Sequence, residues 1–99
     1  MNILQNYIAG KLAEPISGKY LDNFDPSTGN VYSLIPDSDD RDVERAVRAA
    51  EAAFPAWSTT PSETRHEILM RLVALIERDL DELALAESID NGKTLAIAK

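Results

Sequence analysis

The sequence predicts an α+β chain in which small antiparallel strands come first and two or three amphipathic helices follow. Up to residue 37 the chain has short β-favouring pieces between turn residues and no helical periodicity. From residue 38 the apolar residues recur at steps of three and four, which is the spacing of a helix face. Ninety-nine residues with 44% hydrophobic content suffice for one small domain over 1–99, and a second domain does not fit.

The first part, 1–37, alternates strand-forming and turn-forming residues. Residues 15–18 make one turn. A second turn spans 25–30, where Pro26 sets φ at the second turn position and Gly29 can take a positive φ. We therefore expect one small antiparallel sheet, and its strands are 7–8, 20–24 and 31–35.

The second part, 38–99, begins with a helix that Ser38 can cap, because a serine side chain accepts a hydrogen bond from the first free backbone N–H groups. Pro55 cannot continue the hydrogen-bond ladder, so the regular helix should end near Phe54, with Trp57 packing from the turn that follows. The apolar stripe of this part of the chain consists of Val43, Ala46, Val47, Ala50, Ala53, Phe54 and Trp57.

A second helix has a stronger start signal. Thr60 is expected as its cap, Pro61 at its first helical position and Glu63 as the partner that completes a capping box. The residues of its apolar face are Ile68, Leu69, Leu72, Val73, Leu75 and Ile76.

A break near Asp79 should separate this helix from a third one. The spacing from Asp79 to Glu82 repeats the capping-box pattern more weakly. We expect the third helix to run to about Asn91, where Gly92 supplies the left-handed residue that ends helices. A helical pattern starts again at Leu95.

Charge and composition exclude several classes of function. Ten Lys and Arg against 17 Asp and Glu give a net charge of −7, so the surface repels nucleic acid and anionic lipid. The absence of cysteine removes disulfides and thiolate chemistry. No stretch approaches the roughly 18 apolar residues of a membrane span. These features indicate a soluble, cytoplasmic protein without nucleic-acid or membrane partners.

Taken residue by residue, the chain offers no catalytic set and no cofactor-binding residues. His66, the single histidine, is expected on the surface. The four glycines are too scattered for a phosphate loop, which argues against a nucleotide-binding protein in its own right. The acids of 37–42 are open to two interpretations, a cation site or an N-terminal helix turn stabilised by carboxylates, and we favour the second.

Several runs, taken in order, resemble the N-terminus of the NAD(P)-dependent aldehyde dehydrogenase superfamily. The last of them, Glu87-Ser88-Ile89-Asp90-Asn91-Gly92-Lys93, is the most distinctive. Details around 25–32 and 86–96 look most like dehydrogenases of 2-aminomuconic or 2-hydroxymuconic semialdehyde. The other matching pieces are Tyr7-Ile8-Ala9-Gly10-Lys11, Phe24-Asp25-Pro26-Ser27-Thr28-Gly29, residues 42–58, Arg65, Leu69 and Leu83-Ala84.

This resemblance implies a reaction in which a cysteine thiolate attacks an aldehyde, hydride passes to NAD or NADP, and water releases a carboxylate. The chain holds none of those parts, so we expect it to be inactive alone. It resembles the N-terminal portion of the α/β coenzyme-binding domain, whose partners are the remainder of the subunit and further copies in a homo-oligomer. The helical pattern that ends at Lys99 suggests that a longer enzyme continues there.

One site of the family maps onto this chain. The resemblance assigns a monovalent cation, Na⁺ or K⁺, to the backbone carbonyls of Asn23 and Phe24 and to the Asp90 carboxylate, with a further ligand from beyond Lys99. Asp25 replaces the Asn of the family pattern. Its carboxylate can strengthen cation attraction or accept a backbone hydrogen bond in an Asx-turn, and we favour the turn.

A rival hypothesis is a free-standing, non-enzymatic module for interaction or oligomerisation. Helix faces that would cover a nucleotide domain are then exposed, and large exposed apolar patches mark association surfaces. The isolated chain is therefore expected to associate with itself.

Overall fold

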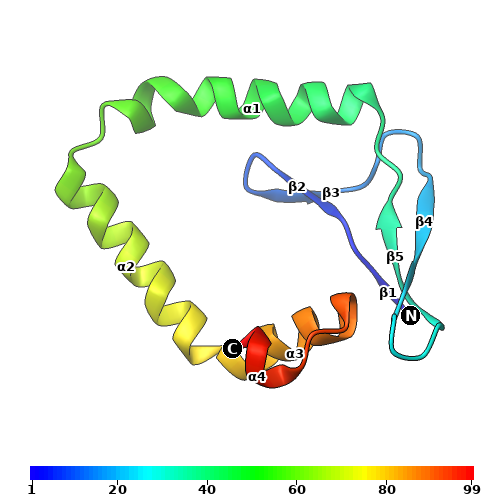
Figure 1. The fold of residues 1–99 in the computed structure, drawn as a ribbon. Coiled ribbons are helices and arrows are strands. Elements are labelled where there is room, and N and C mark those ends of the chain that lie inside the picture. The colour runs from blue at the N-terminus through cyan, green and yellow to red at the C-terminus, as the bar shows by residue number, and fades with distance from the viewer. The chain divides into compact units, whose positions relative to one another are not determined.

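The structure is a computed structural model that describes residues 1–99. It consists of two compact units. Figure 1 shows its strands and helices, coloured along the chain from β1 to α4. The first unit comprises Met1–Phe24 and Val31–Thr59, and the second comprises Asp25–Asn30 and Thr60–Lys99. No helix combines the length and the apolar character that crossing a bilayer requires.

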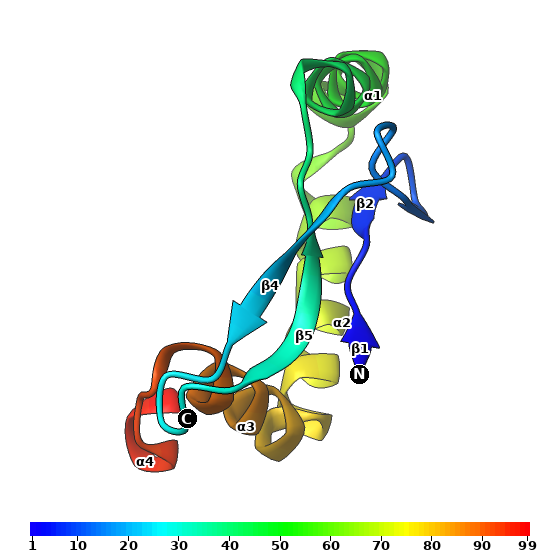
Figure 2. The ribbon, with the colours of Figure 1, turned by 90° about the vertical axis from the view of Figure 1, so that its right-hand side faces the viewer.

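The first unit contains five short strands in two sheets. In the larger sheet, β4 (Tyr20–Phe24) pairs antiparallel with β5 (Val31–Pro36), and β1 (Asn2–Ile3) pairs parallel with the other edge of β5. The smaller sheet is a hairpin of β2 (Asn6–Ile8) and β3 (Lys11–Ala13). Figure 2 shows β4 and β5 as a twisted pair.

The strands expected at 7–8, 20–24 and 31–35 are confirmed, but the single antiparallel sheet is wrong. There are two sheets, and one of them is mixed. Turn residues in a sequence mark local hairpins, whereas the parallel partner of β1 lies some thirty residues further along the chain. The two-residue β1 and the strand β3 carry too little β-favouring sequence to be found locally.

Both predicted turns form. The Gly18 N–H donates to the Pro15 carbonyl over 2.9 Å. In the second turn, the Asp25 carbonyl accepts from the Gly29 N–H at 2.8 Å, and the Asp25 N–H donates to the Asn30 carbonyl at 2.8 Å. Gly29 has a φ of +72°, the left-handed value that the sequence predicted for it.

Helix α1 (Asp40–Ser58) is capped by Asp39 and not by Ser38, so that part of the prediction is wrong. The Asp39 carboxylate accepts from the Arg41 N–H at 2.9 Å, and the Asp39 N–H donates to the Asp42 carboxylate at 3.0 Å. This reciprocal pair is a capping box made from two acids, which also suit the positive end of the helix dipole. The Ser38 hydroxyl instead accepts from the Asn6 amide at 2.9 Å.

The expected end of this helix near Phe54 is also wrong, because α1 continues through Pro55 to Ser58 and includes Trp57. Pro55 stands in the last turn, where it removes only the bond of its own missing N–H. The carbonyls that the helix end leaves open find side-chain donors. The hydroxyls of Ser58 and Thr59 donate to the Pro55 carbonyl at 3.2 and 3.0 Å.

In the second unit, α2 (Ser62–Arg78) begins one residue later than predicted. Pro61 is its N-cap, with a ψ of 145° that places it outside the helix, so Glu63 falls at the second helical position and not the third. The fixed φ of a proline suits a helix start, but ψ stays free, and here it is extended.

The break between the second and third helices is confirmed at Asp79, since α3 spans Leu80–Asn91. The weaker capping box at this point is wrong, because Asp79 makes no side-chain cap. Its two carboxylate oxygens instead accept from the Arg78 guanidinium at 2.8 and 2.7 Å. The helix ends at Gly92 with a φ of +81°, as predicted, and the short α4 (Leu95–Ala98) follows.

The apolar faces of the helices are open to solvent. Side chains of the predicted α2 stripe are between 37% exposed, at Ile68, and 55% exposed, at Leu69. Apart from Pro15, Ala84 is the only aliphatic or aromatic residue that is buried. The total accessible surface is 7617 Å², against about 5,600 Å² for an ordinary folded monomer of this mass. The chain therefore leaves more surface open to solvent than an ordinary folded monomer of its mass, and these helix faces are part of that surface.

Asp42 holds the first unit together locally. Its side chain is 3% exposed, and its two oxygens accept from the Ile16 N–H and the Asp39 N–H, each at 3.0 Å. The loop after β3 is thereby tied to the first turn of α1. A buried carboxylate with two backbone donors is expensive to remove, because both N–H groups lose their acceptor.

Replacing Asp42 with alanine should destabilise the first unit by about 1–3 kcal/mol, because two backbone donors are left without an acceptor. The matched control is Asp40→Ala, an exposed acid in the same helix turn, which should cost about 0.5 kcal/mol. Urea unfolding followed by far-UV circular dichroism measures both. Equal losses for the two variants would contradict the role assigned to Asp42.

Candidate functional site

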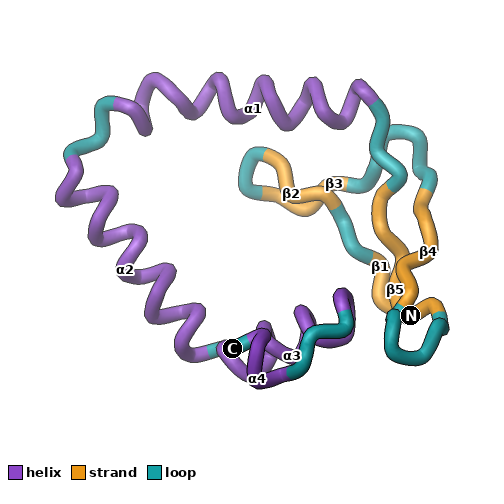
Figure 3. Tube along the Cα trace, in the orientation of Figure 1, coloured by secondary structure: helices purple, strands orange, loops and turns teal.

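The end of α3 is a self-contained network of polar groups. One Glu87 oxygen accepts from the Asn91 amide at 2.6 Å and from the Lys93 ammonium at 2.9 Å. The Asn91 side-chain oxygen accepts from the Lys93 N–H at 2.9 Å, and the Ser88 hydroxyl donates to the Lys93 carbonyl at 2.5 Å. These bonds join the two ends of the run from Glu87 to Lys93 and fix the loop between α3 and α4. Figure 3 shows the course of this loop in teal.

The turn at Asp25–Asn30 lies against this helix end within the second unit. A Cβ placed on Gly92 would meet the Pro26 ring, at 3.4 Å from Cγ and 3.9 Å from Cβ. Two runs that are some sixty residues apart in the sequence, and that both carry the family resemblance, are therefore packed together. This contact between Gly92 and Pro26 is where the structure brings two of the sequence motifs together.

The charges of the network are matched. The hydrogen bond and the positive charge of Lys93, followed by the hydrogen bond from the Asn91 amide, hold the pKa of Glu87 below its usual value. Glu87 is consequently ionised near neutral pH, and its ion pair with Lys93 is formed there.

The predicted cation ligands lie in different units. Asn23 and Phe24 are adjacent in β4 of the first unit, at an irregularity in its pairing with β5. The Asn23 amide donates to the Ser33 hydroxyl at 3.0 Å, so this side chain links β4 to β5. Asp90 is an exposed residue in the last turn of α3, in the second unit. The cation site formed by these three residues stays a prediction.

Asp25 has the role that we favoured for it. One carboxylate oxygen accepts from the Ser27 N–H at 2.8 Å and from the Ser27 hydroxyl at 2.7 Å. This is an Asx-turn, in which the aspartate side chain mimics the backbone of a turn. The side chain thus shapes the turn that packs against Gly92.

The acids at the start of α1 also have the structural role that we favoured. Arg41 forms an ion pair with Asp39 at 2.7 Å, and hydrogen bonds from the Arg41 side chain and backbone lower the pKa of Asp39. No group of three or more His, Cys, Asp or Glu side chains is placed to hold a metal ion. His66 is exposed on α2, as predicted.

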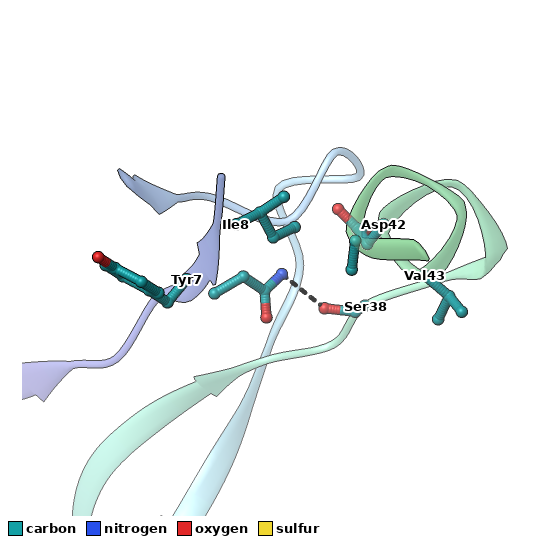
Figure 4. A pocket seen from close by; sticks show the side chains of 7 residues that line it. Tyr7, Ile8, Ser38, Asp42 and Val43 are labelled. Carbon is teal, nitrogen blue, oxygen red and sulfur yellow. Dashed lines mark hydrogen bonds between the residues drawn. The ribbon is translucent and has the colours of Figure 1, made fainter. Parts of the chain in front are cut away.

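A hollow of about 200 Å³ lies between the β2–β3 hairpin and α1 (Figure 4). Its volume falls below the roughly 300 Å³ at which small-molecule sites begin. Its polar side chains are engaged within the unit, since Asn6 bonds to Ser38 and Asp42 accepts from backbone N–H groups. The Tyr7 ring points away from α1. These features give the hollow a packing role.

Sequence reasoning missed the bond from Asp42 to the loop at Ile16. The spacing of Asp39 and Asp42 is a readable signal for a capping box, because the two acids stand three residues apart. The loop contact has no such signal, since it joins positions 26 residues apart.

The residues present do not fit a dinucleotide cofactor. A phosphate cradle needs clustered glycines that let the backbone approach the ligand. Gly10, Gly18 and Gly29 instead stand singly in turns, each with a positive φ and with open space around the position of a Cβ. The chain also has no cysteine to act as the nucleophile.

Comparison with known proteins defines the class. Residues 13–99 match the family described as the aldehyde dehydrogenase family. The chain therefore belongs to the aldehyde dehydrogenase family, as its motifs suggested.

Relatives with assigned activities are semialdehyde and aldehyde dehydrogenases. The chain is 50% identical over 97 residues to the 2-aminomuconic semialdehyde dehydrogenase of Bos taurus, which covers 98% of this chain and 20% of that protein. It is 44% identical over 89 residues to acetaldehyde dehydrogenase 2 of Cupriavidus necator, covering 90% of this chain and 18% of the relative. The chain spans about a fifth of the length of these relatives.

Solved structures show the same fold. HpcC from Thermus thermophilus superposes with a TM-score of 0.95 at 36% identity, over 98% of this chain and 19% of that one. A protein described as a putative methylmalonate-semialdehyde dehydrogenase, from Sinorhizobium meliloti and in complex with NAD, superposes with a TM-score of 0.92. Its identity to this chain is 35%, over 99% of this chain and 20% of that one. The α+β arrangement of short strands followed by helices is thus the N-terminal arrangement of aldehyde dehydrogenases.

The Glu87 ion pair should make the helix end sensitive to acid. Because the folded-state pKa of Glu87 is lowered from 4.5, its contribution is full above that value and is lost as the pH falls through the folded pKa. Glu87→Gln should therefore lower the melting temperature at about pH 7, and this effect should shrink progressively as the pH is lowered below 4.5. Glu77→Gln, an exposed control on α2, should show no such pH dependence. A Glu87→Gln effect that is constant with pH would contradict this account.

If Asn23, Phe24 and Asp90 hold a monovalent cation, the chain should melt about 2 °C higher in KCl or NaCl than in choline chloride. Asp90→Asn should abolish the difference, because it removes the only charged ligand, whereas Glu77→Gln should preserve it. Differential scanning calorimetry makes the comparison at equal ionic strength. Identical melting curves in KCl, NaCl and choline chloride would contradict a cation site at these residues.

Proposed function

We propose that this chain is the N-terminal portion of the coenzyme-binding domain of an NAD(P)-dependent aldehyde dehydrogenase that oxidises an aldehyde to a carboxylate. The observation that carries the proposal is the packing of Gly92 against Pro26, which joins two motif runs in a chain that superposes on aldehyde dehydrogenases over nearly its whole length. Strands and turns over 1–37 and helices over 38–99 supply this portion.

Within such an enzyme the segment has a structural task. It contains no catalytic residue and no cofactor-binding residue, so we expect the isolated chain to be inactive. Its proposed role is structural. Polar contacts within the segment fix its strands and helix ends, and the uncovered apolar faces of α1 and α2 provide surface for packing. The proposed occupant of those faces is the remainder of the same subunit.

The proposed substrate class is a muconic semialdehyde. Four 2-aminomuconic semialdehyde dehydrogenases are 46–50% identical to this chain, whereas four relatives described only as aldehyde or acetaldehyde dehydrogenases are 41–44% identical. Because the segment holds no substrate-binding group, this margin supports common ancestry with the semialdehyde enzymes.

The wider properties follow from the same proposal. NAD or NADP is the cofactor of the whole enzyme and is bound by residues outside this segment, as is the catalytic cysteine. We propose a homo-oligomer, as the family resemblance implies, and a cytoplasmic location, supported by the absence of cysteine. The cation at Asn23, Phe24 and Asp90 belongs to this proposal.

A chimera tests the proposed function. In the chimera, this chain replaces the corresponding segment of the bovine 2-aminomuconic semialdehyde dehydrogenase. The rate of NAD-dependent oxidation of the aldehyde should stay within about tenfold of the bovine enzyme's rate, because the replacement changes no catalytic side chain. The matched control, the bovine enzyme without that segment, should be inactive. The 99-residue chain alone should form no NADH and release no heat with NAD.

A soluble chimera that forms no NADH would contradict the enzymatic role. It would favour the rival function, a free-standing interaction module, for which the exposed helix faces are the supporting observation.

A further inference from the structure

We propose that Asn91 is a deamidation site that the folded end of α3 keeps closed, and that its conversion to an acid opens that end. Asn91 is followed by Gly92, and a glycine has no side chain to hinder attack by its own backbone nitrogen. The other four asparagines precede Ile3, Tyr7, Phe24 and Val31, all of which are bulky. The inference is independent of the proposed enzymatic function.

The chemistry needs only water. The backbone nitrogen of Gly92 gives up its proton and attacks Cγ of Asn91, forming a C–N bond. The Asn91 side-chain nitrogen then leaves as ammonia, which takes up the proton, and a cyclic imide remains. Water adds to either carbonyl of the imide and breaks one C–N bond, which leaves aspartate or isoaspartate. Nothing is oxidised or reduced in these steps.

The folded helix end withholds the attacking atom. The Gly92 N–H donates to the Ser88 carbonyl at 2.9 Å, so this nitrogen faces the helix and not the side chain of Asn91. Asn91 is itself the last residue of α3, and Gly92 is held at a φ of +81°. Attack therefore requires the last helix turn to open, and helix ends are among the first segments of a protein to do so.

The amide group is otherwise well placed to react. Its oxygen accepts from the Lys93 N–H at 2.9 Å, and this donor would stabilise the negative charge that develops on the oxygen during attack. Its nitrogen donates to the Glu87 carboxylate at 2.6 Å, and the residue is exposed to water. The bond between Gly92 and Ser88 is thus the barrier that the structure adds.

Conversion would replace the hydrogen bond between Asn91 and Glu87, which closes the helix end, with a repulsion between two carboxylates. An acid at position 91 has no N–H to donate, so it would set a second carboxylate where the amide now lies 2.6 Å from the Glu87 oxygen. Lys93 would face both charges, with Asp90 next in the chain. Negative charge is also unfavourable at the C-terminal end of a helix. The helix end should then open and loosen Gly92 from Pro26.

The first test follows conversion by peptide mass spectrometry, with an isoaspartyl methyltransferase to detect isoaspartate. In the folded 99-residue chain, Asn91 should convert at least about tenfold more slowly than in the same chain in urea, and the other asparagines should stay intact. Glu87→Ala should raise the folded-state rate severalfold, because it removes the acceptor that holds the Asn91 amide and Lys93. Glu77→Ala, its matched control, should leave the rate unchanged. Equal rates in buffer and urea, or equal conversion of the other asparagines, would overturn the proposal.

The second test uses Asn91→Asp as a mimic of the product. Hydrogen exchange of the Gly92 amide should speed up by about tenfold or more in this variant, because the bond to Ser88 opens more often. Asn30→Asp, which adds the same charge in the turn at Asp25–Asn30, should leave that exchange rate unchanged. Full protection of Gly92 in Asn91→Asp would overturn the claim that conversion opens the helix end.

Discussion

The structure depends on one constraint: the helices carry apolar faces that this chain has no means to bury by itself. Ala84 and Pro15 are its only buried aliphatic or aromatic residues, while Leu69 on α2 and Phe54 on α1 are 55% and 67% exposed. Hydrophobic burial is ordinarily the dominant stabilising term in a fold. Here backbone ladders, caps and turns define the elements, and the apolar faces stay uncovered; the proposed remainder of the enzyme would cover them.

The side-chain polar contacts that define the helices and turns lie at the ends of these elements. Asp39 and Asp42 close the start of α1, Asp25 shapes the turn before β5, and Glu87 closes the end of α3. The three aspartates accept from backbone N–H groups that a helix start or a turn would leave open, whereas Glu87 accepts from the side chains of Asn91 and Lys93. The packing of Gly92 against Pro26 then sets the end of α3 against the turn. Ends that are fixed by polar contacts, combined with uncovered faces, support the proposal that this chain is a portion of a larger coenzyme-binding domain.

Local sequence signals predicted the elements well where one interaction decided them. The change from strand-and-turn residues to helical periodicity at residue 38, the break at Asp79 and the left-handed Gly92 are all confirmed. The errors arise where two interactions compete or a distant partner decides. Asp79 bonds to Arg78 and makes no cap, Pro55 is tolerated in a last turn, and β1 pairs with a strand thirty residues away. The Asx-turn of Asp25 was readable, whereas the cation site rests on the family resemblance alone.

The most direct measurement of the central claim is sedimentation of the isolated chain over a range of concentrations, with a dye that binds exposed apolar surface. Uncovered helix faces predict dye binding and a mass that rises above 10.9 kDa with concentration. A species that stays at 10.9 kDa, binds no dye and unfolds in one cooperative step would contradict the account.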